Sequence, residues 1–146
     1  MRTGILALCS LTFGSLASCS TVMTGTSQTA DLVNARWSVE SVAGTVEPQQ
    51  GSPSATIRFG DDGAISGTLL CNSIGGGIRW RPDGRFEFTN EPTVQTMAGC
   101  VATDEARRFG RKFWDAMKTA RYWNFHRDNL RIAFADGEVA ELSALD

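Results

Sequence analysis

The sequence predicts an α+β domain, namely a mainly antiparallel, strongly curved β-sheet or small barrel with one packed α-helix. Short segments with alternating apolar residues, separated by turns that contain glycine or proline, predict most of the strands. One segment, which begins after Thr103, instead has apolar residues at helical spacing. More strand-like segments follow it, so strands and helices do not alternate as a parallel α/β sheet requires.

The first expected strand covers residues 36–42, where apolar and polar residues alternate. Turn sequences such as Asp61-Asp62-Gly63 and Pro82-Asp83-Gly84 then separate pairs of strands, because glycine accepts the positive φ that tight turns require. The expected hairpins join residues 55–59 to 64–69, 77–80 to 85–88, and 122–126 to 129–134. A last strand covers residues 139–142.

The helix is expected to begin at a cap formed by Thr103 or Asp104. Its apolar stripe consists of Ala106, Phe109, Phe113 and Met117. We interpret the stripe as a surface that packs on the sheet, with a partner-docking face as the alternative. The basic residues away from the stripe are Arg107, Arg108, Arg111 and Lys112. We interpret them as a solvated face, with contact to lipid headgroups as the alternative.

The composition fits one ordinary globular domain. The chain has 146 residues, of which 42% are hydrophobic and 21% are charged, and these values exclude a largely disordered protein. Removal of an export signal leaves about 110 residues to fold, which suffices for a core without a metal. The formal net charge is −2, so no nucleic-acid partner is expected, because phosphate binding requires a concentrated basic surface.

The amino terminus resembles a bacterial lipoprotein signal. Met1-Arg2 is a short positive region, and the apolar run at residues 3–17 is too short to cross a bilayer but has the length of a signal-peptide core. It ends in Leu16-Ala17-Ser18-Cys19, which resembles a lipobox. The resemblance implies cleavage after residue 18 and acylation of Cys19, so that the lipid bilayer is a partner. An ordinary secretory signal and a buried amino-terminal helix are the alternatives.

We therefore expect residues 1–18 to be a lipoprotein signal peptide, residues 19–34 to be the lipidated cysteine with a flexible tether, and residues 35–146 to be the folded domain. Two or more acyl chains anchor a protein stably. Ser20 follows Cys19, where an aspartate would favour retention in the inner membrane. The expected location is the cell envelope, at the outer membrane facing the periplasm.

Cys71 and Cys100 form an even pair once Cys19 carries lipid. In an oxidising compartment we expect a structural disulfide between them, which would close a loop of about 29 residues. Two buried thiols or a reactive redox pair are the alternatives. No Cys-x-x-Cys motif supports redox chemistry.

The same cysteines lie in two stretches that resemble the signatures of the META domain, the family that includes HslJ-like envelope proteins. Gly67, Cys71-Asn72 and Gly75 match the first signature, and Thr96 four residues before Cys100 matches the second. The opening tryptophan strand, the hairpin before the first cysteine and the helix after the second also fit the family pattern. The resemblance covers roughly residues 35–142.

Two departures weaken the first signature: Leu70 replaces the glycine before the cysteine, and Ile74 stands where an aromatic residue is common. The resemblance implies a compact β-rich domain without an established catalytic centre, and a loose association with stress and drug tolerance. The signature residues Gly67, Asn72, Gly75 and Thr96 are interpreted as structural. We therefore predict a non-catalytic envelope domain that binds an unknown envelope protein or small ligand. A small inhibitor of a hydrolase is the alternative, and an enzyme is the third reading.

The candidate chemical groups do not indicate an active site. His126 is the only histidine, no Gly-x-Ser-x-Gly motif accompanies it, and its place in a strand favours a surface position. A zinc site would require Cys71, Cys100, His126 and a carboxylate to converge, so no metal or other cofactor is expected. Gly75-Gly76-Gly77 is interpreted as a turn or bulge, because it lacks the Lys-Ser/Thr of a phosphate loop.

Aromatic residues supply the candidate contact surface. Trp114 lies about 100° away from the apolar stripe of the helix, and Trp123 points away from Tyr122 on its strand. Together with Trp80 they exceed what one face of a small sheet requires. Trp80, Trp114 and Trp123 are therefore predicted to include residues that line a groove or a protein contact surface.

Overall fold

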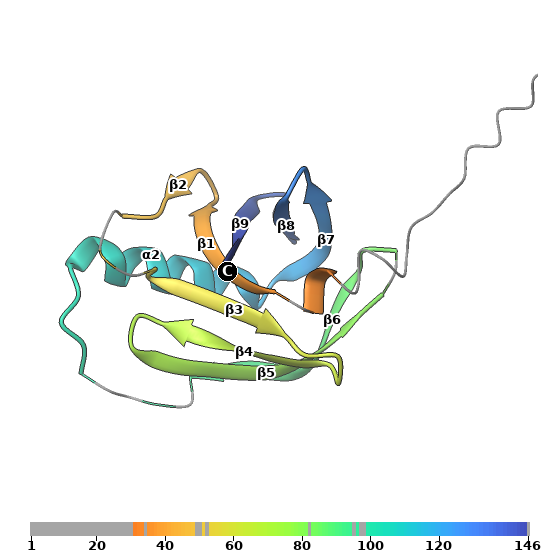
Figure 1. Ribbon diagram of the computed structural model, residues 1–146, viewed down its shortest axis with the longest axis horizontal. Helices are drawn as coiled ribbons and strands as arrows, with labels where there is room; N and C mark the ends of the chain where they lie inside the picture. Colours follow the sequence, from red (N-terminus) through yellow and green to blue (C-terminus); the bar gives the residue numbers. More distant parts are fainter. Residues whose placement is uncertain are drawn as a thin grey trace, which may run out of the picture.

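The computed structural model describes residues 31–33, 35–48, 51, 53–81, 83–94, 96 and 99–145 (Figure 1). The predicted signal peptide, Cys19 and most of the predicted tether lie outside the described residues. The named elements are β1 (Arg36–Val42), β2 (Thr45–Val46), β3 (Ala55–Phe59), β4 (Ala64–Leu69), β5 (Asn72–Trp80), β6 (Phe86–Val94), α2 (Asp104–Met117), β7 (Ala120–His126), β8 (Asn129–Phe134) and β9 (Val139–Leu145).

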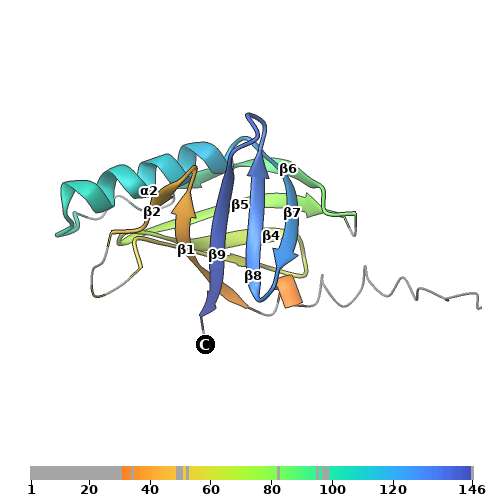
Figure 2. The same cartoon turned by 90° about the horizontal axis from the view of Figure 1, so that it is seen from above.

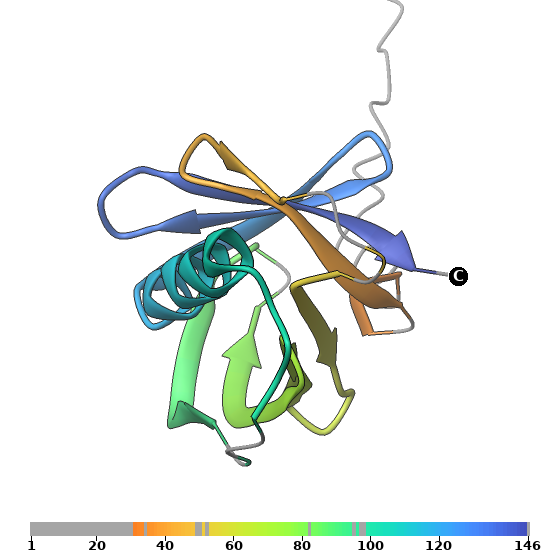
Figure 3. The same ribbon diagram turned by 90° about the vertical axis from the view of Figure 1, so that its left-hand side faces the viewer.

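All of these strands belong to one antiparallel sheet, in the order β6-β5-β4-β3-β1-β9-β8-β7, with β2 paired to β1. The sheet curves until its two edge strands meet (Figures 2 and 3). An isolated bridge joins Arg85 to Tyr122, and the Trp123 amide donates to the Gly84 carbonyl at 2.6 Å. The predicted fold class, a mainly antiparallel, strongly curved sheet or small barrel with one packed helix, is confirmed, and the sheet is nearly closed.

The three predicted hairpins are present as β3–β4, β5–β6 and β7–β8. The middle hairpin is longer than predicted, because β5 begins at Asn72 and so includes Gly75 and Gly76, which were expected to precede the strand. The register between β5 and β6 shifts on both sides of Gly77, so this stretch forms β-bulges. Bulges bend a strand and increase its twist, which suits a sheet that must close on itself.

Helix α2 begins where predicted. The Thr103 side chain accepts a hydrogen bond from the Ala106 amide at 3.1 Å, and two acidic residues occupy the first turn. The buried residues of the helix are Ala106, Phe109, Gly110, Phe113, Trp114 and Met117. The apolar stripe therefore packs in the core as predicted. The buried side of the helix is wider than predicted, because it also includes Gly110 and Trp114. Figure 3 shows α2 lying at the side of the barrel next to β6.

The core is a single hydrophobic cluster that the barrel encloses and α2 covers. Its largest fully buried side chains include Phe59, Phe113, Leu32, Ile57 and Ile74. Leu32 is 0% exposed, and its carbonyl accepts a hydrogen bond from the Trp37 indole at 3.1 Å. We expected this residue in the tether. Its burial moves the start of the packed domain to residues 31–33, ahead of the predicted boundary at Ala35.

Candidate functional site

The signature cysteine Cys71 lies in a two-residue turn that joins β4 to β5. Leu69 pairs with Asn72 across this turn, and Leu70 has a φ of 58°. A positive φ at the first central residue is typical of type II′ turns, which favour glycine there. The glycine of the family pattern is thus explained by backbone geometry. In this chain Leu70 adopts the same conformation at a steric cost, because its Cβ crowds the following carbonyl.

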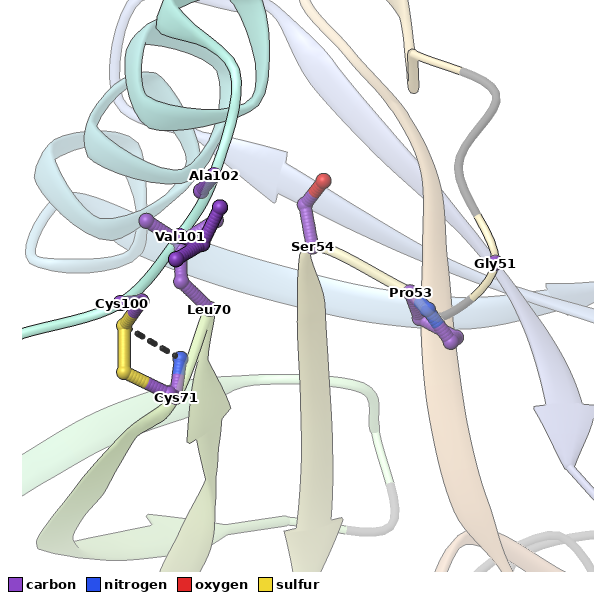
Figure 4. A pocket seen from close by; sticks show the side chains of 8 residues that line it. All are labelled: Gly51, Pro53, Ser54, Leu70, Cys71, Cys100, Val101 and Ala102. Carbon is purple, nitrogen blue, oxygen red and sulfur yellow. Dashed lines mark hydrogen bonds between the residues drawn. A yellow bond between two sulfur atoms is a disulfide. The ribbon is translucent and has the colours of Figure 1, made fainter.

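Cys71 and Cys100 form a disulfide, with 5.9 Å between their Cα atoms. The Cys71 amide also donates to the Cys100 sulfur at 3.2 Å (Figure 4). On the other side, the Cys100 carbonyl accepts a hydrogen bond from the Arg107 guanidinium at 3.5 Å. The disulfide therefore fastens the segment that precedes α2 to the end of the β4–β5 hairpin.

Thr96 makes a second connection to the same hairpin. Its hydroxyl accepts a hydrogen bond from the Ser73 amide at 2.9 Å and donates to the Asn72 side-chain oxygen at 3.4 Å. Asn72 and Thr96 thus hold the chain after β6 against the start of β5. A hydroxyl suits this position, because it accepts and donates at the same time. These contacts are consistent with structural roles for both residues.

Gly67 lies where β4 passes close to the backbone of β3. It pairs with Ile57 of β3 on one side and Ile74 of β5 on the other. A Cβ atom at this position would lie 2.0 Å from the Thr56 carbonyl oxygen, a distance that real Cβ atoms do not reach. Gly67 therefore permits the tight pairing of β3 with β4 that places the cysteine turn. The remaining signature glycine, Gly75, lies in β5 opposite Ser66.

A cleft of about 420 Å³ opens beside the disulfide (Figure 4). Its described lining consists of Gly51, Pro53, Ser54, Leu70, Cys71, Cys100, Val101 and Ala102. Figure 4 shows Leu70, Val101 and Ala102 gathered on one side, with Ser54 and Pro53 on the other. Val101 is fully exposed. Since both cysteines are in the disulfide, the described lining contains no ionisable side chain.

Glu47 fixes the loop that leads into one wall of this cleft. Its carboxylate accepts a hydrogen bond from the Ser54 amide, and its own amide donates to the Glu40 carbonyl at 2.8 Å. Burial raises the pKa of Glu47 above its ordinary value of 4.5, and this effect exceeds the lowering by hydrogen bonds from Ser54. The group acts as an acceptor for the loop and lies outside the cleft lining.

Two of the three predicted contact aromatics are core residues, so that prediction is wrong for Trp114 and Trp123. Trp114 is 7% exposed, because α2 is embedded in the barrel over a broad arc. Trp123 is 4% exposed, because its strand turns Tyr122 outward at a register shift and the indole inward. Trp80 is half-buried and meets Phe59 edge-on, with 6.2 Å between the ring centroids. It keeps part of its surface at the rim of a separate polar hollow.

The candidate chemical groups stay apart. His126 is exposed at the end of β7, as its strand pattern indicated. Asp62 shapes its turn by accepting a hydrogen bond from the Ala64 amide at 2.9 Å. Within the part of the chain that the structure describes, no group of three histidine, cysteine or acidic residues is placed to hold a metal.

Three features of this region were not predicted, because short sequence patterns give little indication of them. The first two are the positive φ of Leu70 and the hydrogen bond from the Ser54 amide to the Glu47 carboxylate. The family glycine at the Leu70 position was a signal for the first. The third is β2, which follows an Ala43-Gly44 turn and has only two residues.

Comparisons with known proteins agree with this architecture. The model of the META domain matches residues 30–146. A duf4847 family protein from Bacteroides vulgatus is 13% identical, with a TM-score of 0.54, covering 77% of this chain and 93% of that one. A protein from Burkholderia xenovorans is 16% identical, with a TM-score of 0.58, covering 99% of this chain and 97% of that one.

A third solved structure is 21% identical, with a TM-score of 0.58, covering 77% of this chain and 91% of that one. At these identities the three structures establish similarity of fold. The search of curated proteins found no match. The family match extends over the whole described barrel, including both signature stretches and the disulfide. The chain therefore belongs to the META domain family.

Proposed function

We propose that this protein is a lipid-anchored envelope protein whose META domain is a non-catalytic binding module. In this proposal, the cleft beside the Cys71–Cys100 disulfide receives the partner. The observation that carries it is the chemistry of the cleft: its described lining is uncharged, combines apolar side chains with polar groups of Ser54 and the backbone, and contains no ionisable side chain. General acid–base catalysis requires such a group within hydrogen-bond reach of the substrate.

The same chemistry indicates the kind of partner. Leu70, Val101 and Ala102 offer apolar contact, while Ser54 and the surrounding backbone offer hydrogen bonds. An uncharged segment with apolar side chains, from an envelope protein or a small molecule, would fit such a lining. Val101 lies at the rim of the cleft and is fully exposed, so a partner that buries this side chain would gain binding free energy from the apolar surface removed from water.

The disulfide supports export, because disulfides persist in oxidising compartments and are rare in the cytosol. Among the described residues, no helix has the length and apolar content needed to cross a bilayer. Membrane attachment in this proposal depends on acylated Cys19. Cell fractionation with a high-salt wash, which removes purely electrostatic membrane contacts, tests it: the natural chain is expected to stay with the membranes, and a Cys19→Ala variant to appear in the soluble fraction. Equal membrane association of both would contradict the lipid anchor.

A photoreactive side chain placed at Val101 tests the binding role of the cleft in living cells. The matched control carries the same group at Ala135, an exposed residue after β8. A discrete cross-linked product is expected from Val101 and not from Ala135. If neither position gives an adduct, or both give the same one, the cleft is not the recognition site.

A further inference from the structure

A second surface lies where the β1–β2 hairpin meets α2 (Figures 1 and 2). The Lys112 ammonium donates to the Ala43 carbonyl at 3.2 Å and to the Thr45 hydroxyl at 2.6 Å, so hairpin and helix are held together. A groove of about 440 Å³ separates them. Its described lining consists of Thr45, Val46, Pro48, Glu105, Arg108, Phe109 and Lys112. We name this groove, together with the exposed Arg111 next to it on α2, the β2–α2 face.

The β2–α2 face is basic where the helix forms it. Arg108, Arg111 and Lys112 are exposed, and because Arg111 and Lys112 lie three and four residues after Arg108, all three lie on one side of α2. Two acids of the helix are engaged elsewhere, since Asp104 pairs with Arg107 and Asp115 with Lys118. Glu105 is the acid of this groove, and none of the three cations forms a salt bridge within the described residues.

An apolar tip stands beside these cations. Val46 is 70% exposed, although β-branched side chains usually pack inside a sheet. Pro48 follows it in the groove lining. β2 itself has two residues, so its edge is too short to pair with a strand of a partner protein. Exposed apolar residues flanked by cations are typical of surfaces that enter the headgroup region of a bilayer.

We propose that the β2–α2 face docks on an anionic lipid bilayer. Val46 would enter the interface between headgroups and acyl chains, while Arg108, Arg111 and Lys112 contact lipid phosphates. The anchor of the proposed function would permit this contact: Asp31 lies near the start of β1, at the opposite end from the hairpin, and the roughly 12 residues between Cys19 and Asp31 span at most about 40 Å. The docking surface itself is independent of the anchor and is tested without it.

Several other basic residues of the described chain provide a contrast. Arg79 and Arg81 pair with Glu87, Arg85 with Asp83, and Arg131 with Glu141. Arg36 and Arg58 face each other across β1 and β3, and Asp61 and Asp62 share a hollow with Arg58. This second arginine pair lies at the far end of β1, about 20 Å from the β2 hairpin, and has no exposed valine beside it.

The test uses the chain from Ser20 onward, which lacks the acyl group but retains the whole described core. Sedimentation with phosphatidylglycerol–phosphatidylcholine vesicles is compared with sedimentation with phosphatidylcholine vesicles at low salt. Three cations near an anionic surface are expected to raise the partition coefficient on the order of 100-fold. Added salt should reduce this preference, because it screens exposed charges.

The variants locate the surface. Arg108→Gln with Arg111→Gln should reduce binding to anionic vesicles by at least 10-fold, whereas lysine at both positions should retain it. Val46→Thr should reduce it several-fold through lost apolar contact. The matched control, Arg36→Gln with Arg58→Gln, makes the same change in net charge and should leave binding within about two-fold. Lys112 stays unchanged because it holds the hairpin.

Equal binding to both kinds of vesicle, or equal loss in the control pair, would overturn the proposal. Binding to an acidic peptide but not to vesicles would overturn it in favour of a protein partner. Circular dichroism melts of each variant establish that the fold is intact. Because the chain used in the vesicle experiment carries no lipid, a negative result there would not bear on the acylation of Cys19, which the cell fractionation tests separately.

Discussion

Substitution of Gly67 by alanine tests the claim that close approach of β3 and β4 builds the cysteine turn. The new methyl group would lie 2.0 Å from the Thr56 carbonyl oxygen, and real Cβ atoms essentially never come within 3.0 Å of an atom outside their own and the adjacent residues. The strands must therefore separate by about 1 Å. That shift would weaken the pairing of Ile57 with Gly67 and the hydroxyl bond between Thr56 and Thr68, which is 2.8 Å long.

The expected loss of stability follows from these contacts. Two weakened hydrogen bonds contribute about 1 kcal/mol each, and overpacking adds about 1–3 kcal/mol. Gly67→Ala should therefore lower the free energy of unfolding by about 3–5 kcal/mol, a large part of the roughly 5–15 kcal/mol that such domains have. In urea this corresponds to a midpoint lower by roughly 2 M.

Urea unfolding of the oxidised protein, followed by tryptophan fluorescence, measures this change. Gly51→Ala is the matched control, because a Cβ there would meet nothing within 4 Å. The control should stay within about 0.5 kcal/mol or gain up to about 1 kcal/mol from reduced entropy of the unfolded chain. A Gly67→Ala variant within 1 kcal/mol of the natural protein would refute the argument from strand approach.

Three further predictions concern the same region. Leu70→Gly should be more stable than Leu70→Ala by about 1 kcal/mol in thermal melts, because both lose the side chain and only glycine relieves the positive φ; equal stabilities would contradict the turn assignment. Replacing Cys71 and Cys100 together by alanine should cost about 3–4 kcal/mol in urea unfolding for a 29-residue separation, and an unchanged midpoint would refute a stabilising disulfide. For Glu47, the raised pKa means that folding favours the protonated carboxyl. This contribution to the free energy of unfolding is fully present below pH 4.5 and is lost as the pH rises through the pKa of the folded state. Glu47→Gln keeps an acceptor for Ser54 and lacks this titration, so its stability relative to the natural protein should increase from acidic to neutral pH.

Local sequence patterns predicted the elements that are locally determined. Turn glycines marked two of the three hairpins, and the Thr103 cap with the phenylalanine spacing marked α2. The closing of the sheet was predicted only as one of two possibilities. Closure depends on long-range contacts, such as the bond from the Trp123 amide to the Gly84 carbonyl, that no short pattern encodes.

The candidate site was predicted in part for the same reason. Spacing and cysteine parity identified Cys71 and Cys100, but the cleft between them and Pro53 exists only because three separate segments converge. Trp114 and Trp123 were misplaced because angular position on one helix or strand does not reveal how deeply that element is embedded. Leu32 was misplaced because a short apolar pair next to a polar stretch carries little periodic signal.

Intact mass of the membrane-extracted protein, measured before and after reduction and alkylation, tests the central claim most directly. The proposal of an exported, lipid-anchored META domain predicts a chain that starts at Cys19 and carries acyl chains, with Cys71 and Cys100 alkylated only after reduction. A soluble, unacylated product would contradict the anchor. Cysteines that react readily before reduction would contradict the disulfide on which the cleft depends.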